Sequence, residues 1–169
     1  MSDVLVIVAS EGKNVELAAA VAAEIDAQGA ASSTVGVLDL GLPLYSTRAE
    51  SNDGVPAAAA EIARRMIESR ALVVIAPEYN GGMPPALVNL IAWVSRSGDD
   101  DWRAAFNGKI TAIATFSGGG GNSVLAAMRA QLAFLGANVL GRQLLTNHGK
   151  PLNPDSATAV VAQLLALSA

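Results

Sequence analysis

The sequence contains no cysteine and a single histidine, His148. The lack of cysteine excludes disulfide scaffolds, thiolate nucleophiles and sites in which cysteine binds zinc or an iron–sulfur cluster. Charged residues are scarce, at 15% of the chain, and the 11 Lys and Arg are scattered among 15 Asp and Glu. Because no basic stripe is present to neutralise a phosphate backbone, we expect no nucleic-acid partner.

Long apolar runs are also missing. The longest, residues 4–9 and 71–77, are too short to cross a bilayer, and the first residues carry no positively charged segment. We therefore expect no membrane partner and a cytoplasmic location. A chain of 169 residues that is 51% hydrophobic fits one domain over residues 1–169. Its low charge and many alanines favour burial of some surface in a homo-oligomer.

What the chain does contain is a regular alternation of apolar runs and amphipathic segments. Strands buried on both faces of a parallel sheet are predicted at residues 4–9, 34–40, 71–76, 110–116 and 137–145. Helices are predicted at residues 14–28, 56–69, 85–95, 123–135 and 155–167. Five such units, joined by right-handed crossovers, predict an open doubly wound α/β sandwich with helices on both faces of the sheet.

Ligands of such sheets bind beyond the carboxyl ends of the strands, which directs attention to the loops after the first, third and fourth strands. The first loop reads Ser10-Glu11-Gly12-Lys13-Asn14. It brings a hydroxyl, an ammonium and an amide to the start of a helix, where unpaired N–H groups favour an anion such as a phosphate monoester. Ser10 and Asn14 fit simple capping of that helix equally well. The loop lacks the spacing of a Walker motif.

The loop after the third strand carries the most information. It reads Pro77-Glu78-Tyr79-Asn80-Gly81-Gly82-Met83-Pro84-Pro85. Two glycines let the backbone approach a flat ligand closely, and the prolines restrict the shapes of the loop. Asn80-Gly81 alone is also ordinary turn chemistry.

The whole string, followed by Leu87-x-Asn89-x-Ile91-x-Trp93-x-Ser95, closely resembles the signature of the NADPH-dependent FMN reductase family. These are flavodoxin-like flavoproteins that include quinone and azo reductases. The resemblance extends in order along the chain, through Leu42-Pro43-Leu44-Tyr45, Asn107-Gly108-Lys109, Ser117-Gly118-Gly119-Gly120-Gly121 and Leu132-x-x-Leu135-Gly136-Ala137.

The resemblance implies a flavodoxin-like three-layer sandwich with a five-stranded parallel sheet in the order 2-1-3-4-5. It also implies an oxidoreductase in which FMN passes hydride from NADPH or NADH to a small acceptor such as a quinone, an azo compound or free flavin. Such an enzyme needs no catalytic side chain and no metal, and it is expected to form a homodimer or homotetramer.

The family likeness also assigns the FMN contacts. The phosphate corresponds to Ser10, Lys13 and Asn14. The ribityl chain and ring correspond to Pro77, Glu78, Tyr79, Asn80, Gly81 and Gly82, with Ser117, Gly118, Gly119 and Gly120 closing the other side of the flavin. Tyr79 and Tyr45 would wall the flavin or its acceptor, although Tyr79 is also compatible with a place in the core.

The chain departs from the family pattern in the phosphate loop. The usual Arg is missing, so Lys13 is left as the nearby cation, and Glu11 would repel phosphate. In the helix after the second loop, Val88 and Ala92 stand where Lys and Asp are common. These changes keep open the alternative of a flavin-binding domain without turnover, or an electron-carrying flavodoxin-like domain.

Other polar residues are interpreted as structural. A response-regulator domain is disfavoured because the first and third strands lead into Ser10-Glu11 and Pro77-Glu78 rather than into the carboxylates it needs. His148 is expected in a loop, away from any metal. Asp99-Asp100-Asp101 is expected at a solvated loop tip. Trp93 and Trp102 are expected to pack on a helix face or a subunit contact.

Overall fold

A parallel sheet forms the middle layer of the molecule. In the computed structural model, which describes residues 3–97 and 101–169, its strands are β1 (Val4–Val8), β2 (Ser32–Gly36), β3 (Ala71–Ile75), β4 (Ile110–Phe116), β5 (Asn138–Val139) and β6 (Leu144–Thr146). The strands follow the order β2-β1-β3-β4-β5, and β6 also pairs with β4. The predicted 2-1-3-4-5 order is therefore confirmed.

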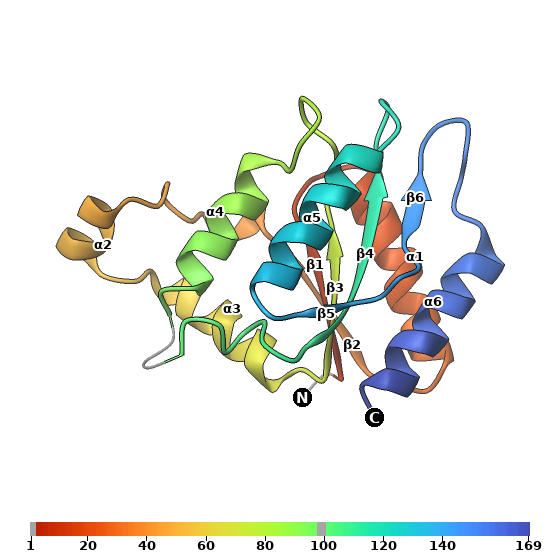
Figure 1. The fold of residues 1–169 in the computed structure, drawn as a ribbon, viewed down its shortest axis with the longest axis horizontal. Helices are drawn as coiled ribbons and strands as arrows, with labels where there is room; N and C mark the ends of the chain where they lie inside the picture. The colour runs from red at the N-terminus through yellow and green to blue at the C-terminus, as the bar shows by residue number, and fades with distance from the viewer. Residues whose placement is uncertain (1–2, 98–100) are drawn as a thin grey trace.

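Helices cover both faces of this sheet, as Figure 1 shows. They are α1 (Lys13–Ala27), the short 3-10 helix η1 (Leu38–Leu40), α2 (Thr47–Asp53), α3 (Ala57–Glu68), α4 (Pro85–Val94), α5 (Asn122–Phe134) and α6 (Pro154–Leu167). No helix among the described residues is both long and apolar enough to span a membrane.

Successive residues of the central strands face opposite cores. Val4, Val6 and Val8 of β1 belong to the cluster that includes apolar residues of α1 and α6. Leu5 and Ile7 belong to the cluster with residues of α3, α4 and α5. All of these side chains are buried, which explains why the strand reads as a continuous apolar run, and each contributes about 1.5–3 kcal/mol of transfer free energy.

The second strand is shorter than predicted and begins earlier. It ends at Gly36 rather than Leu40, and residues 38–40 form η1. The Asp39 carboxylate lies over Gly36, in the space that a Cβ there would take, and Gly41 closes η1 at a φ of 57°. The predicted strand end at residue 40 is therefore wrong, because the chain turns away from the sheet at Gly36.

The predicted fifth strand, residues 137–145, is two strands separated by an excursion. Beyond β5 the chain leaves the sheet at exposed Gly141 and returns at Leu144 as β6. Arg129 on α5 stabilises this excursion, since its guanidinium donates to the Gly141 carbonyl at 3.3 Å and to Gln143 Oε1 at 2.9 Å. The sheet therefore has a sixth strand.

Helix α2 is an addition to the predicted elements. Ser46 caps its start by accepting the Ala49 N–H at 3.0 Å, and the helix ends at Gly54. It contains no buried residue, so it has no apolar periodicity from which it could be predicted. Figure 1 shows it at the far end of the molecule from α1 and α6.

Lys109, the last residue of the segment Asn107-Gly108-Lys109 before β4, has a structural role. Its ammonium donates to the carbonyl oxygens of Ile67 at 2.6 Å and Ser69 at 2.5 Å, at the C-terminus of α3. A cation is favoured there by the unpaired carbonyls and the helix dipole. Partial burial lowers the pKa of Lys109.

Candidate functional site

The predicted site residues follow the carboxyl ends of three neighbouring parallel strands. Residues 9–12 connect β1 to α1, residues 76–84 connect β3 to α4, and residues 117–121 connect β4 to α5. Because β1 pairs with β3 and β3 pairs with β4, these loops share one edge of the sheet. The fold therefore brings the predicted residues to one rim. Their contacts with FMN stay a prediction.

The first loop leaves the start of α1 open. Gly12 occupies the N-cap at a φ of 59° and ψ of −124°, and it has no side chain to accept from the first turn. Its carbonyl accepts the N–H groups of Val15 and Glu16. The N–H groups of Lys13 and Asn14 precede these bonds, so they lie at the end of the helix where an anion is favoured.

Asn14 is buried and binds the backbone of β4 rather than capping α1. Its side-chain nitrogen donates to the Phe116 carbonyl at 3.0 Å, and its side-chain oxygen accepts the Phe116 N–H at 2.8 Å. This pair of bonds joins the first loop to the end of β4. The alternative in which Asn14 caps α1 is therefore not what the structure shows, and its contact with the cofactor stays a prediction.

Ser10 and Lys13 are at the surface of the same rim. The Ser10 hydroxyl donates to the Glu11 carbonyl at 3.2 Å. The Lys13 ammonium lies 2.8 Å from Glu16 Oε2, and the two side chains are 55% and 66% exposed. Such exposed ion pairs contribute little stability, about 0–1 kcal/mol, so the ammonium can exchange Glu16 for another anion at low cost.

The second loop ends in a tight turn. Tyr79 and Gly82 exchange two backbone hydrogen bonds of 3.0 Å, and the central residues Asn80 and Gly81 have φ values of 50° and 75°. Positive φ at both central positions is typical of a type I′ turn and explains the Asn-Gly pair. The Gly82 N–H is hydrogen-bonded within the turn, whereas the N–H groups of Asn80 and Gly81 take no part in the two bonds that close it.

The loops of residues 76–84 and 117–121 are joined by hydroxyl groups. Ser117 is buried, and its Oγ accepts the Glu78 N–H at 2.8 Å and lies 2.7 Å from Thr115 Oγ1. Thr115 Oγ1 donates to the Ala76 carbonyl at 2.6 Å, so the Ser117 hydroxyl must be the donor to Thr115. The Ser117 hydroxyl therefore uses its only proton within the protein, and its backbone N–H donates to the Thr146 carbonyl at 3.1 Å, so Ser117 positions the loops. Its contact with the cofactor stays a prediction.

Glu78 provides the cap that α5 lacks in its own sequence. The N-cap is Gly121, which has no side chain, and the Glu78 carboxylate accepts from the N–H groups of Ser123 at 3.1 Å and Val124 at 3.3 Å. A carboxylate at a helix N-terminus is stabilised by the unpaired N–H groups and the helix dipole. Glu78 therefore holds the glycine-rich segment 118–121 against the second loop.

Replacing Glu78 by alanine is expected to lower the free energy of unfolding by about 1–2 kcal/mol, because the Ser123 and Val124 N–H groups lose their acceptor. Urea unfolding followed by circular dichroism measures the change. The control is Glu11→Ala, which removes an exposed carboxylate from the neighbouring loop and should shift stability by less than about 0.5 kcal/mol. Equal effects of the two substitutions would contradict the capping role.

Two residues of the family signature have a role that the sequence did not reveal. On α4, Asn89 Oδ1 accepts the Tyr45 N–H at 2.8 Å and Trp93 Nε1 donates to the Pro43 carbonyl at 2.7 Å. Asn89 Nδ2 also donates to Pro43 at 3.0 Å. Their spacing of one helical turn places both on one side of α4, so the motif anchors the segment 42–45 there.

The tyrosines predicted to wall the site differ in their surroundings. Tyr79 is 52% exposed, so the alternative of a place in the core is wrong. Tyr45 is half-buried, with its ring edge-on to Trp93 at 5.1 Å and its hydroxyl donating to Glu50 at 2.9 Å. Trp93 itself is buried, and Trp102 is 42% exposed beside Phe134.

Asp101 and His148, both interpreted from the sequence as structural, are exposed side chains. Asp99 and Asp100 are outside the described residues, and the described Asp101 is exposed. His148 is exposed in a turn in which Asn147 and Lys150 exchange two backbone bonds. Its ring meets that of Phe116 edge-on at 5.1 Å, in agreement with the predicted loop position.

Comparisons with known proteins agree with this geometry. A model of the family described as "NADPH-dependent FMN reductase" matches residues 2–151. The quinone reductase of Escherichia coli K12 is 33% identical over 103 residues, which cover 60% of this chain and 53% of that protein. The match thus spans about half the length of this curated relative.

Solved structures show the same fold. FerB from Paracoccus denitrificans, a flavoenzyme NAD(P)H:(acceptor) oxidoreductase, is 19% identical, with a TM-score of 0.74 over 99% of this chain and 96% of that one. A flavodoxin from the domain Archaea is 14% identical, with a TM-score of 0.70 over 98% and 97%. Together with the strand order, these structures confirm the predicted flavodoxin-like α/β sandwich.

Proposed function

Because this chain belongs to the NADPH-dependent FMN reductase family, we propose that it is an FMN-dependent NAD(P)H oxidoreductase. It takes hydride from NADPH or NADH and reduces a small acceptor such as a quinone, an azo compound or free flavin. When bound, FMN supplies the hydride chemistry itself. The observation that carries the proposal is the open N-terminus of α1, on the same rim as the loops of residues 76–84 and 117–121.

The phosphate of FMN fits the open start of α1. Gly12 leaves the backbone N–H groups of Lys13 and Asn14 for an external anion, and the Ser10 hydroxyl lies in the same loop. The Lys13 ammonium would exchange its exposed partner Glu16 for the phosphate. The missing arginine is thus compensated by backbone donors, with Lys13 contributing as a point charge.

The ring of FMN fits between the two loops that Ser117 and Glu78 join. The Asn80-Gly81 turn offers N–H groups at its tip, and the glycines at 118–120 let the backbone come close to a flat ligand. Exposed Tyr79 would cover the ring or its acceptor and exclude water. In this arrangement the chain binds and orients the cofactor, and no side chain needs to transfer a proton.

Flavin uptake followed by turnover tests the proposal. Purified protein is titrated with FMN while flavin fluorescence and the visible spectrum are recorded, and NADPH oxidation is then followed with and without a quinone. A reductase takes up FMN and oxidises NADPH steadily when the quinone is present. Flavin uptake without steady turnover would support the non-catalytic flavin-binding or electron-carrier alternative, and no uptake would overturn both.

Replacing Lys13 by alanine is expected to weaken FMN binding about 1.4-fold to fivefold, since an exposed charge contributes about 0.2–1 kcal/mol. Quenching of flavin fluorescence measures the affinity. Lys150→Ala is the matched control, because it removes an exposed lysine that is not among the predicted phosphate contacts. Unchanged affinity in Lys13→Ala would remove Lys13 from the phosphate site.

A further inference from the structure

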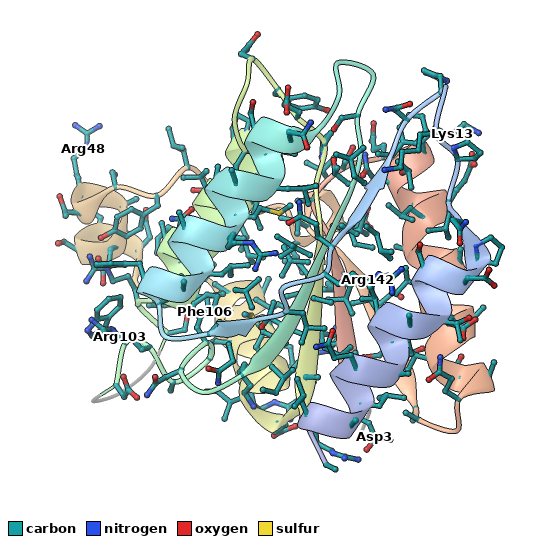
Figure 2. The ribbon with its side chains drawn as sticks, turned by 45° about the vertical axis from the view of Figure 1, so that its right-hand side comes forward. Asp3, Lys13, Arg48, Arg103, Phe106 and Arg142 are labelled. Atoms are coloured by element: carbon teal, nitrogen blue, oxygen red, sulfur yellow. The ribbon has the colours of Figure 1, made fainter. Side chains whose placement is uncertain are left out.

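A pocket of about 370 Å³ opens between α1 and the segment that connects β6 to α6. Of the predicted FMN contacts, its lining includes Lys13 and none of the residues from the loops after β3 and β4. Figure 2 shows Lys13 at the N-terminal end of α1, beside the chain that runs from β6 to α6. The pocket therefore borders the proposed flavin rim without being part of it.

One wall is a single face of α1. It is made by Lys13, Glu16, Leu17 and Ala20, whose spacing places them on one side of the helix. Leu17 is buried and belongs to the apolar core, so it forms part of an apolar floor. Lys13 and Glu16 are exposed and place one charge of each sign in this wall.

The opposite wall combines apolar side chains with the polar residues Thr146, Asn147 and His148, and backbone bonds hold its turn in place. It includes Phe116, Leu152 and Pro151, and His148 packs edge-on against Phe116 at an interplanar angle of 88°. The turn that carries His148 is closed by the backbone bonds between Asn147 and Lys150, of 2.9 and 3.1 Å. Its position does not depend on a ligand, so the wall is formed in advance.

The chemistry of these walls defines the ligand. A mostly apolar pocket of a few hundred cubic ångströms with a small number of polar groups is typical of small-molecule sites. The Phe116 ring favours another ring, in offset or edge contact. The exposed pair between Lys13 and Glu16 is weakly held, so a ligand anion can replace Glu16 as the partner of Lys13.

We propose that this pocket binds a small planar aromatic ring that carries an anionic group. The ring lies against Phe116 and Leu152, and the anion meets Lys13, whose three N–H donors allow it to contact this anion and the FMN phosphate together. Two kinds of ligand combine such a ring with an anion: the adenosine 2′-phosphate end of NADPH, and a separate aromatic acid. Binding itself is independent of the proposed reductase activity. Assignment to the dinucleotide rests on that activity.

Calorimetry on the purified protein at neutral pH tests the proposal with adenosine 2′-phosphate and benzoate as probes. At least one of these two probes should bind. Adenosine lacks the anion and inorganic phosphate lacks the ring, so each should bind at least about tenfold more weakly than adenosine 2′-phosphate. Glu16→Gln removes the competing carboxylate, so it should tighten binding of the anionic probe about twofold to fivefold.

Filling the pocket provides the decisive comparison. Ala20→Leu places a branched side chain in the pocket from an exposed helical position, and it should weaken binding about tenfold or more. Ala19→Leu makes the same change at the adjacent exposed position, which does not line the pocket, and should leave affinity within about twofold. Thermal unfolding by circular dichroism verifies that both variants are folded.

Absence of binding by both probes, or equal affinity in Ala20→Leu and Ala19→Leu, would overturn the proposal. The probe that binds identifies which of the two ligands the pocket accepts. Binding of adenosine 2′-phosphate, with a raised KM for NADPH but not NADH in Ala20→Leu, assigns the pocket to the dinucleotide. Preferential binding of benzoate with unchanged KM assigns it to a separate acid. A protein that binds a probe and shows no turnover supports the pocket and contradicts the reductase.

Discussion

Replacing Gly121 by alanine is expected to lower the free energy of unfolding by about 2–4 kcal/mol and to weaken FMN binding more than tenfold. Gly121 has a φ of 83°, and an added Cβ would lie 2.7 Å from Thr115 Cγ2 and 3.4 Å from Ser117 Cβ. Thr115 is fully buried and Ser117 nearly so, and their hydroxyls join the loops of residues 76–84 and 117–121. Neither side chain can move away without disturbing those bonds.

Urea unfolding measures the stability change, and flavin fluorescence measures the affinity. Gly118→Ala is the matched control on the same loop, because a Cβ there would meet no atom within 4 Å among the described residues. Its stability should stay within about 0.5 kcal/mol of the parent protein. If both variants lost stability equally, the close packing of Gly121 against Thr115 would not be the cause.

Replacing Asn14 by leucine is expected to cost about 2–4 kcal/mol, because the substitution leaves both the N–H and the carbonyl of Phe116 without their partner in a half-buried place. The side chains are similar in size, so lost hydrogen bonds rather than a cavity dominate the change. FMN affinity should fall more than tenfold, since Asn14 sets the start of α1 relative to β4.

Asn138→Leu is the control for Asn14→Leu. Asn138 is exposed and its amide makes one hydrogen bond, of 3.1 Å to the Gly108 carbonyl, so the same substitution should cost less than about 1 kcal/mol. Denaturant unfolding compares the two variants. Similar losses in both would show that the bonds between Asn14 and Phe116 do not hold the rim together.

The central part of the fold could be predicted because its physical cause is local. A strand buried on both faces, such as β1 or β3, must be apolar at every position, and that pattern is visible in residues 4–9 and 71–76. The edges were harder to predict. Residues 137–145 include the exposed excursion at Gly141, and its stabilisation by Arg129 comes from a different element.

The location of the site could be predicted from the sequence, but the contacts within it could not. The order of the strands brings the loops of residues 9–12, 76–84 and 117–121 to one edge, and the resemblance to the FMN reductase family implies that order. The bonds of Asn14 to Phe116 and of Glu78 to the start of α5 join residues that are distant along the chain. The family resemblance assigns Asn14 and Glu78 to the cofactor, and that assignment stays a prediction beside the structural bonds that they make.

The distance along the chain between Asn14 and Phe116 has a consequence for the order of events during synthesis. The two residues are 102 positions apart, so the start of α1 acquires its place only after β4 has been made and has joined the sheet. A nascent chain that ends before Phe116 should not retain FMN, however well its first helix has formed. Retention of FMN would then show that the sheet is complete. A series of stalled ribosome–nascent chain complexes of increasing length would show at which length this happens.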